Sequence, residues 1–350
     1  MGGKKPTIDD VAALAGVARV TVSRVLNGNP NVRDSVRDRV FKAVEMLGYT
    51  VNMQARSLAG GRMHVLALVV ESDVESEPNS YYQSGLELGA LRACTEAGIQ
   101  LVVQTVSERA AEGRAKILGL VAARGCEGLI LTPPFSDDLE LIDSLNSLGF
   151  PVSCISPGRA ASTRANGVRI DEESAGHELA LHLLGLGHRR FGYLRGLAGH
   201  LSAEDRFEGF KRALARAGLD PSAYRAEQGN FTFRSGVELA QALLTADDRP
   251  TALVCANDDM AVGALFSAHR IGLDIPGDVS IVGFDDTPIS EIIWPPLTTI
   301  HHPIKTLGYT AARMLVERIK GGGNDPRTEI VPHRLVVRDT SGPAGPLRQQ

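Results

Sequence analysis

Short hydroxyl and cationic side chains lie close together between residues 19 and 24, in the stretch VARVTVSRVL. Arg19 and Arg24 could pair with phosphates or with base edges, and the hydroxyls of Thr21 and Ser23 could bind phosphates. Val20 lies among them and is small enough to meet a base edge. If the segment is a helix, these residue types indicate contact with the major groove of DNA.

A second set of polar side chains follows the apolar segments of the later chain, where buried strands are expected to end. The set combines carboxylates, an amide, a guanidinium and an aromatic ring, namely Thr132, Arg206, Phe231, Asn257, Asp258, Asp259, Asp285 and Asp286. Such groups are typical of a site for sugar hydroxyls and for the face of a sugar ring. Phe231 could equally stack on a purine base, so both ligand classes stay open.

The paired acids at 258–259 and 285–286 also allow a glycoside hydrolase to be considered. Adjacent residues at one strand end rarely point together, so each pair fits a ligand contact plus a structural partner better. His188 and the pair His301 and His302 lack the HxxxH or HExxH spacing of metal sites. No GxxxxGK[ST] or GxSxG motif is found either. We therefore expect no catalysis, no metal and no cofactor.

The 350 residues carry a net charge of −4, but this charge is unevenly distributed. Up to Arg62 there are ten basic and five acidic residues, which leaves +5 there and −9 on the remainder. A basic beginning on an acidic body is expected when only one end of a protein meets phosphate.

The composition also bears on location. No apolar run approaches the roughly 20 residues of a membrane helix, and the start MGGKKPTIDD lacks the apolar segment of a signal peptide. The four cysteines are far apart and form no CxxC pair. Reduced thiols in a cytoplasmic protein are the expected state.

Local signals predict a helix-turn-helix head over residues 1–50. Thr7 and Asp10 form a capping-box pattern before a helix-forming run, and Gly16 is a typical helix end. The β-branched residues of the next segment would suit a strand, but its apolar residues recur at helical spacing, at Ala18, Val22, Val25 and Leu26. A third helix is expected from about Ser35 to Leu47. Residues 51–62 read as a hinge helix or linker that is too short to be stable alone.

Beyond the linker, apolar strands alternate with helices in two successive sets, which predicts an α/β core with parallel sheets in two lobes over residues 63–341. Lobe 1 is expected at about 63–160 and 297–325, lobe 2 at about 161–296 and 326–341, and a flexible tail at 342–350. The expected strands are Val65–Val70, Leu101–Gln104, Gly128–Leu131 and Val152–Ile155, then Gly167–Ile170, Phe191–Leu194, Ala252–Cys255 and Ser280–Phe284.

The segments TIDDVAALAGVARVTVSRVLNG and RVFKAVEMLGY resemble the DNA-binding head of the lac repressor (LacI/GalR) family of bacterial transcriptional regulators. LGLGHRRFGYLRG, RFEGFKRAL, ALVCANDDMAVGAL, VSIVGFDD and PPLTTIHHP resemble the same family's core. The resemblance implies a three-helix head plus a two-lobed, periplasmic-binding-protein-like core made of two Rossmann-like subdomains.

The resemblance also implies residue roles. The DNA-binding residues would be Thr7, Arg19, Val20, Thr21, Ser23, Arg24, Asn27, Arg33, Tyr49, Asn52, Ala55 and Leu58, with Leu58 as the minor-groove wedge of a paired hinge helix. The effector-binding residues would be Tyr82, Thr132, Ser156, Arg206, Phe231, Asn257 and Asp285. Three residues depart from the family's usual ones: Ala18 stands where Ser is usual, Arg33 where Ser or Thr is usual, and Val51 where Pro is usual. Residues 156–158 depart from the acid–Arg pair of many sugar-sensing members.

We therefore expect a homodimeric, ligand-responsive regulator that binds a palindromic double-stranded DNA operator. It would be a repressor of carbohydrate uptake or utilisation genes, with a mono- or disaccharide as effector. No leucine heptad is found near the end of the sequence, which favours a dimer. The alternatives are a purine- or nucleoside-sensing member of the same family and a solute-binding protein without DNA activity.

Overall fold

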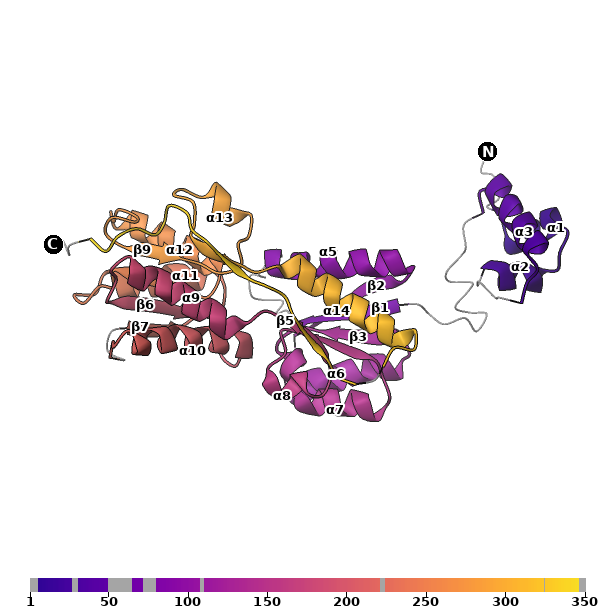
Figure 1. Ribbon diagram of the computed structural model, residues 1–350, viewed down its shortest axis with the longest axis horizontal. Helices are drawn as coiled ribbons and strands as arrows, with labels where there is room; N and C mark the ends of the chain where they lie inside the picture. The colour runs from indigo at the N-terminus through magenta and orange to yellow at the C-terminus, as the bar shows by residue number, and fades with distance from the viewer. Residues whose placement is uncertain are drawn as a thin grey trace. The chain divides into compact units, whose positions relative to one another are not determined.

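The computed structural model describes residues 6–26, 31–49, 65–71, 80–107, 110–220, 224–323 and 325–345. The chain divides into two compact units, Met1–Met63 and His64–Gln350, which we call the head and the core. Each unit is described by itself (Figure 1).

The described part of the head is a three-helix bundle of α1 (Ile8–Ala15), α2 (Arg19–Leu26) and α3 (Asp34–Leu47). Both expected ends of α1 are confirmed. The Thr7 hydroxyl accepts from the Asp10 backbone N–H while the Asp10 carboxylate accepts from the Thr7 N–H, and Gly16 adopts a left-handed φ of 63°. Because α2 is helical, the strand interpretation of its β-branched residues is wrong. Its Val22 packs in a core with Val11 and Val40.

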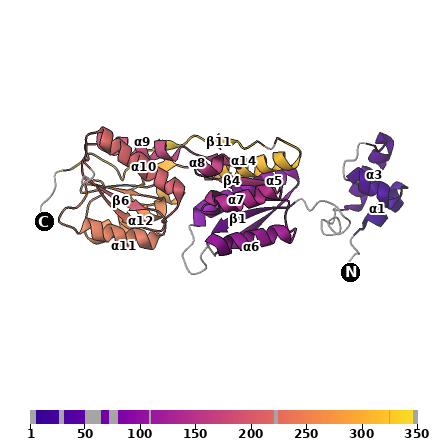
Figure 2. The ribbon, with the colours of Figure 1, turned by 90° about the horizontal axis from the view of Figure 1, so that it is seen from below.

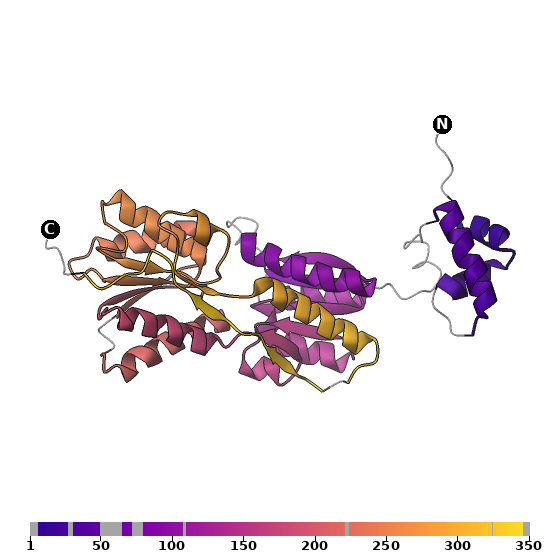
Figure 3. The same cartoon turned by 45° about the horizontal axis from the view of Figure 1, so that its top comes forward.

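Lobe 1 of the core contains a six-stranded parallel sheet in the order β11-β5-β4-β3-β1-β2. Its strands are β1 (Val65–Glu71), β2 (Gln100–Val106), β3 (Gly128–Leu131), β4 (Val152–Ile155), β5 (Asn166–Arg169) and β11 (Thr328–Ile330). Helices α5 (Ser80–Ala97) and α14 (Ile304–Ile319) lie side by side on one face, and α6 (Ala110–Ala122) and α7 (Leu139–Ser147) lie on the other (Figures 1 and 3). Successive residues of β1 are buried alternately against the two layers, which explains why the strand is apolar throughout.

Lobe 2 has a four-stranded parallel sheet in the order β7-β6-β8-β9. The strands are β6 (Phe191–Arg195), β7 (Tyr224–Gln228), β8 (Ala252–Cys255) and β9 (Ser280–Val282). Figure 2 shows α9 (Glu172–Gly185) and α10 (Leu201–Arg216) on one side of β6, with α11 (Phe233–Leu244) and α12 (Asp258–Arg270) on the other. Short elements complete the core: the 3-10 helix η1 (Phe135–Asp137), α8 (Arg159–Ser162), α13 (Ile289–Ile292), β10 (Thr299–His301) and β12 (Arg334–Val336).

The segments that cross between the lobes correct three of the expected boundaries. β5 pairs with β4 and β11, so residues 166–169 belong to lobe 1 and not to lobe 2. For the same reason β11 belongs to lobe 1, while β10 pairs with β12 in lobe 2 (Figure 3). Apolar periodicity identifies a strand but carries no information about its partner, which is why these assignments failed.

The tail expected to be flexible from residue 342 is held on lobe 2 as far as residue 344. The Gly342 N–H donates to the Ser280 hydroxyl at 3.1 Å, and the Ala344 N–H donates to the Leu186 carbonyl at 2.9 Å. Residues 346–350 lie outside the described residues. The four cysteines are free and buried.

Reciprocal glycines bring α9 and α10 unusually close together. A Cβ at Gly176 in α9 would overlap the carbonyl oxygen of Arg206 in α10, and one at Gly209 in α10 would overlap that of Glu173 in α9. The same device joins α5 to α14 and α11 to α12, through Gly89, Gly308, Gly236 and Gly263. The glycine contact therefore determines how far the backbone of Arg206 lies from α9.

We expect Gly176→Ala to lower the free energy of unfolding of the core by about 1–3 kcal/mol, because the added methyl group must push the two helices apart. Gly185→Ala is the matched control, since a Cβ there, in the last turn of the same helix, meets nothing within 4 Å. Urea unfolding of both variants measures the difference. Equal stability of the two would contradict close packing at Gly176.

Candidate functional sites

The first candidate site is the exposed side of the head, where α2 begins. Val20 is 58% exposed although it is a large apolar residue. The Arg19 side chain is 66% exposed and lies 3.6 Å from the Asp9 carboxylate, which is equally open to solvent. Such a surface ion pair contributes little, so Arg19 can exchange Asp9 for another partner at low cost. Arg24 is also exposed, and Thr21 and Ser23 are half-buried.

The other predicted DNA-binding residues of the head have structural roles as well. The Thr7 hydroxyl belongs to the capping box of α1, and the half-buried Tyr49 packs against the head's core. Arg33 is exposed and precedes α3, where its side chain makes no capping bond. Ala18 likewise has no hydroxyl to offer, and its carbonyl accepts from the N–H groups of Thr21 and Val22. Asn27, Asn52, Ala55 and Leu58, and the whole expected hinge at 51–62, lie outside the described residues.

The second candidate site is a cluster of buried polar side chains in the core, centred on Arg206 of α10. Arg206 Nε donates to Glu172 Oε2 at 2.6 Å, and its Nη1 donates to the Ala256 carbonyl at 3.1 Å. The guanidinium carbon lies 3.7 Å from the centre of the Phe284 ring. Both charged side chains are almost fully buried, at 6% and 1% exposure. A buried ion pair of this kind is held by its geometry, and loss of either partner leaves an uncompensated charge.

His302 connects this ion pair to Asp285 and Tyr82, because its ring lies 5.7 Å from that of Phe284. His302 Nδ1 lies 3.0 Å from Asp285 Oδ1, and the rings of Tyr82 and His302 are 5.8 Å apart. Burial raises the pKa of Tyr82 well above its usual range, and the charge of Asp285 adds to that effect, while Arg206 and the Ser156 hydroxyl oppose it. Tyr82 therefore stays protonated and can donate a hydrogen bond.

His200 and Phe231 lie next to the same residues. Their rings are 5.1 Å apart at 72°. Burial, assisted by the positive charge of Arg206, lowers the pKa of His200 to about 4, so the ring is neutral near pH 7. The Asn257 amide donates to the Phe231 carbonyl at 2.9 Å and accepts from the Met260 N–H at 3.0 Å. Asn257 thus caps α12 and fixes the loop that carries Phe231. We call the whole group the polar cluster: Tyr82, Ser156, Glu172, His200, Arg206, Phe231, Asp285 and His302.

Backbone strain is concentrated at the same place. Among the described residues, five that are not glycine have a positive φ. Three of them are in the polar cluster: Ser156 at 49°, Phe231 at 66° and Asp285 at 113°. A fourth, Asp286 at 54°, is the neighbour of Asp285. Such conformations persist only where the surroundings enforce them, and they are common at ligand sites.

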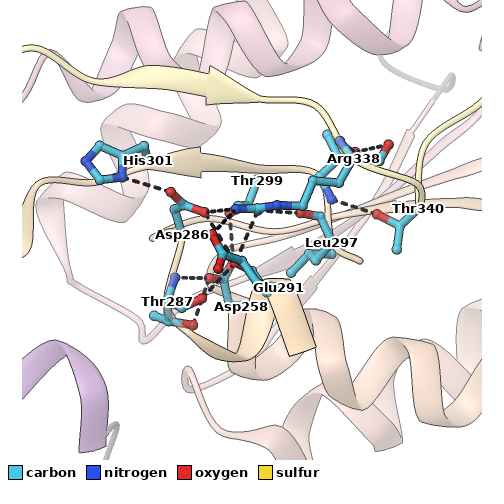
Figure 4. Close-up of polar contacts among 11 residues, drawn as sticks. Asp258, Asp286, Thr287, Glu291, Leu297, Thr299, His301, Arg338 and Thr340 are labelled. Atoms are coloured by element: carbon cyan, nitrogen blue, oxygen red, sulfur yellow. Dashed lines mark hydrogen bonds and ion pairs between the residues drawn. The ribbon is translucent and has the colours of Figure 1, made fainter. Parts of the chain in front are cut away.

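One member of each pair of acids has a structural role, namely Asp258 and Asp286. Asp258 accepts from the Thr287 N–H, the Thr287 hydroxyl and the Thr299 hydroxyl at 2.7–2.9 Å, and Asp286 is bound by Arg338 and His301 at 2.7 and 2.9 Å (Figure 4). Asp258 and Asp286 are therefore occupied within lobe 2. Asp285, by contrast, belongs to the polar cluster.

The turn that carries Ser156 is supported by Asp137 of η1. Asp137 Oδ1 accepts from the Gly158 N–H at 2.6 Å, while its Oδ2 is buried with no hydrogen-bond partner in the described part of the chain. Burial raises the pKa of Asp137 to about 6, and the bond from Gly158 opposes this shift. The ionised form is therefore disfavoured in the folded protein.

Because the folded pKa of Asp137 exceeds the unfolded one, its contribution to stability is greatest at low pH and is lost as the pH rises to about 6 and beyond. We expect Asp137→Asn to raise Tm by about 1–3 °C at pH 8 and to give no gain at pH 4. The control is Asp143→Asn, which changes an exposed carboxylate on α7. An equal gain at both pH values would show that burial of the Asp137 charge is not the cause.

Of the predicted effector residues, the structure joins Tyr82, Ser156, Arg206, Phe231 and Asp285 in the polar cluster, with Asn257 supporting it. Thr132 is buried at the end of β3, where its hydroxyl donates to the Val69 carbonyl within lobe 1. Sequence reasoning missed Glu172, His200 and His302. Glu172 and His302 each follow a strand end, β5 and β10, so the rule that found Asp285 could have found them.

A helix-turn-helix head joined to a two-lobed α/β core defines the class of DNA-binding transcription regulators with a ligand-binding core. Residues 7–52 match the family of bacterial regulatory proteins, lacI family, and residues 180–341 match the periplasmic binding protein-like domain.

Similar proteins extend the match over nearly the whole chain. The HTH-type transcriptional regulator CelR of Thermobifida fusca is 32% identical over 338 residues, which cover 96% of this chain and 98% of that protein. The structure of a transcriptional regulator CelR–cellobiose complex has a TM-score of 0.71 at 32% identity, with 96% and 100% covered. The lac repressor dimer bound to operator and the anti-inducer ONPF has a TM-score of 0.80 at 29% identity, with 96% and 99% covered.

The chain belongs to the lacI family of transcription regulators, as the resemblance implied, and it is not an enzyme. Within the described residues, no helix combines the length and the apolar character that crossing a membrane requires.

Proposed function

We propose that the protein is a cytoplasmic, homodimeric repressor that binds a palindromic operator and responds to a mono- or disaccharide bound at the polar cluster. The observation that carries this proposal is the polar cluster itself. It combines a buried guanidinium, carboxylates, a protonated tyrosine and an aromatic ring, which suit sugar hydroxyls and a sugar ring. A relative of similar length and fold has been solved with cellobiose, which supports a sugar in this class of core.

The cluster is suited to control because its members come from both lobes. Tyr82 and Ser156 belong to lobe 1, and Arg206 and Asp285 belong to lobe 2. A ligand that contacts both sets favours one arrangement of the lobes over another, and this preference is what shifts operator affinity. The required coupling is about 1–3 kcal/mol. The proposed effector residues are the cluster together with Thr132 and Asn257.

In the head, Arg19 and Val20 would read base edges, with Arg24 beside them. The residues proposed to bind phosphates or the minor groove are Thr7, Thr21, Ser23, Asn27, Arg33, Tyr49, Asn52, Ala55 and Leu58. Two heads on a two-fold axis would meet two symmetric half-sites, which is why a dimer suits a palindrome. Exposed apolar residues on α5 and β2, namely Leu88, Leu91 and Val103, offer surface for such an association.

The test is capture of sheared genomic DNA by the purified protein at about 0.15 M salt, where purely electrostatic binding is weak. The proposal predicts recovery of a shared palindrome next to carbohydrate-uptake genes. A palindrome next to nucleotide-synthesis genes would favour the purine-sensing alternative. If no DNA were recovered above background, either by the protein alone or with cell metabolites added, the result would favour a solute-binding protein without DNA activity.

A further inference from the structure

Among the residues that the structure describes, the charges around Arg206 are balanced or negative, with no cation left over for an anionic ligand. Arg206 pairs with Glu172, and a second buried carboxylate, Asp285, lies close enough for its charge to act on both Arg206 and Tyr82. His200 is neutral near pH 7 because burial lowers its pKa to about 4. His302 contacts Asp285 through Nδ1 and adds no unpaired charge. Positive charges among these residues therefore do not outnumber the carboxylates.

The cations on neighbouring elements are also paired. Arg169, at the end of β5, lies 3.2 Å from Asp205, and Arg195, at the end of β6, lies 3.2 Å from Glu204. A phosphate or carboxylate entering the polar cluster would therefore have to displace an existing carboxylate partner, or lie beside it as a like charge. Like charges at such distances oppose binding strongly.

Glu172 Oε1 is a buried acceptor that needs a hydrogen-bond donor from a ligand, and His302 Nε2 is a second such acceptor in the neutral ring with its proton on Nδ1. Glu172 Oε1 and His302 Nε2 are buried, and neither has a hydrogen-bond partner in the part of the chain that the structure describes. The contact of His302 Nδ1 with Asp285 assigns the ring proton to Nδ1, which makes Nε2 of the neutral ring an acceptor. A buried acceptor without a donor is costly, so a bound group that donates is favoured. Hydroxyls donate, whereas ionised phosphates and carboxylates can only accept.

We propose that Glu172 is a specificity-determining residue that restricts the effector to uncharged, hydroxyl-rich ligands and excludes their phosphorylated and carboxylate forms. The inference rests on the proposed effector site and adds the charge class of its ligand. Glu172 acts in two ways: its Oε2 neutralises Arg206, and its Oε1 accepts from a ligand hydroxyl. Glu172 is the first residue of α9, which packs against α10, and this position holds its carboxylate within hydrogen-bond distance of Arg206.

The test is isothermal titration calorimetry of the full-length protein with three matched pairs of probes. The pairs are glucose and glucose 6-phosphate, ribose and ribose 5-phosphate, and cellobiose and its aldonate, cellobionate. At least one neutral probe should bind, and its anionic counterpart should bind about 100-fold more weakly or worse, because it meets two carboxylates and no free cation. In Glu172→Gln the amide oxygen can still accept from Arg206, and the discrimination should fall about tenfold or more.

Two further variants separate charge from structure. Glu172→Asp keeps the carboxylate and should keep the discrimination against anions. Glu178→Gln removes an exposed carboxylate on the same helix, one that lies 3.3 Å from His333, and should change neither affinity.

Tight binding of an anionic probe by the wild-type protein would overturn the inference, as would unchanged discrimination in a Glu172→Gln protein that still binds the neutral probe. If none of the three neutral probes bound, the proposal of an uncharged, hydroxyl-rich ligand would be overturned. Because operator capture does not depend on these titrations, each of these results is distinguishable from failure of the DNA-binding function.

Discussion

Replacement of Arg206 by alanine is expected to abolish the effector response while operator binding persists. The guanidinium bonds Glu172 and the Ala256 carbonyl and lies over Phe284, so its loss removes the central contact of the polar cluster. It also leaves the Glu172 carboxylate buried without its partner, which should cost about 3–5 kcal/mol of core stability. Operator affinity with and without saccharide, measured below the lowered Tm, tests the response, and urea unfolding tests the stability.

Arg212→Ala is the matched control, because this arginine lies on the same helix, is 49% exposed and pairs with Glu173 at the surface. Loss of such a surface pair should cost about 0–1 kcal/mol and leave the response intact. If the operator affinity of the Arg206→Ala protein changed with saccharide concentration in the same way as that of the wild type, Arg206 would lie outside the effector site.

Arg19→Ala is expected to remove most of the operator specificity and to leave saccharide binding unchanged. Arg19 is exposed at the beginning of α2, where it makes a weak contact with Asp9. A bidentate contact between arginine and a base discriminates by about 1–3 kcal/mol, and a dimer makes the contact in both half-sites. The measurement is the ratio of affinities for the operator and for a scrambled duplex at one salt concentration.

Lys42→Ala provides the comparison for this variant, since it removes one positive charge from α3 of the same head. It should weaken binding to both duplexes similarly and so preserve their ratio. An unchanged ratio in Arg19→Ala would show that α2 does not read the sequence through this residue.

Local signals in the sequence were sufficient where an element depends on its own residues. The ends of α1 followed from Thr7, Asp10 and Gly16, because capping involves neighbours in the chain. The bounds of β3, β4 and β8 agree with those predicted, because each is a short apolar run between polar turns. The strand β7 was missed, since YRAEQ is a polar, partly exposed edge strand that has no apolar pattern.

Long-range pairing was what the sequence could not supply. The lobe to which β5, β10 and β11 belong depends on the strand that each meets, and periodicity is silent on this point. The place of Glu172 just after β5 could have marked it as a site residue, but its pairing with Arg206, 34 residues away in the chain, could not be read from the sequence. Arg206, Asp285 and Phe231 were predicted from their residue types after the expected strands and from family resemblance, and the structure adds how burial and charge relate them.

The most direct test of the account is the affinity of the full-length protein for a captured operator, measured by fluorescence anisotropy with and without a neutral saccharide that calorimetry has shown to bind. We predict a change of about fivefold or more at saturating saccharide, in the range that typical coupling energies provide. An operator affinity that stays constant while the saccharide is bound would contradict control of the head by the polar cluster.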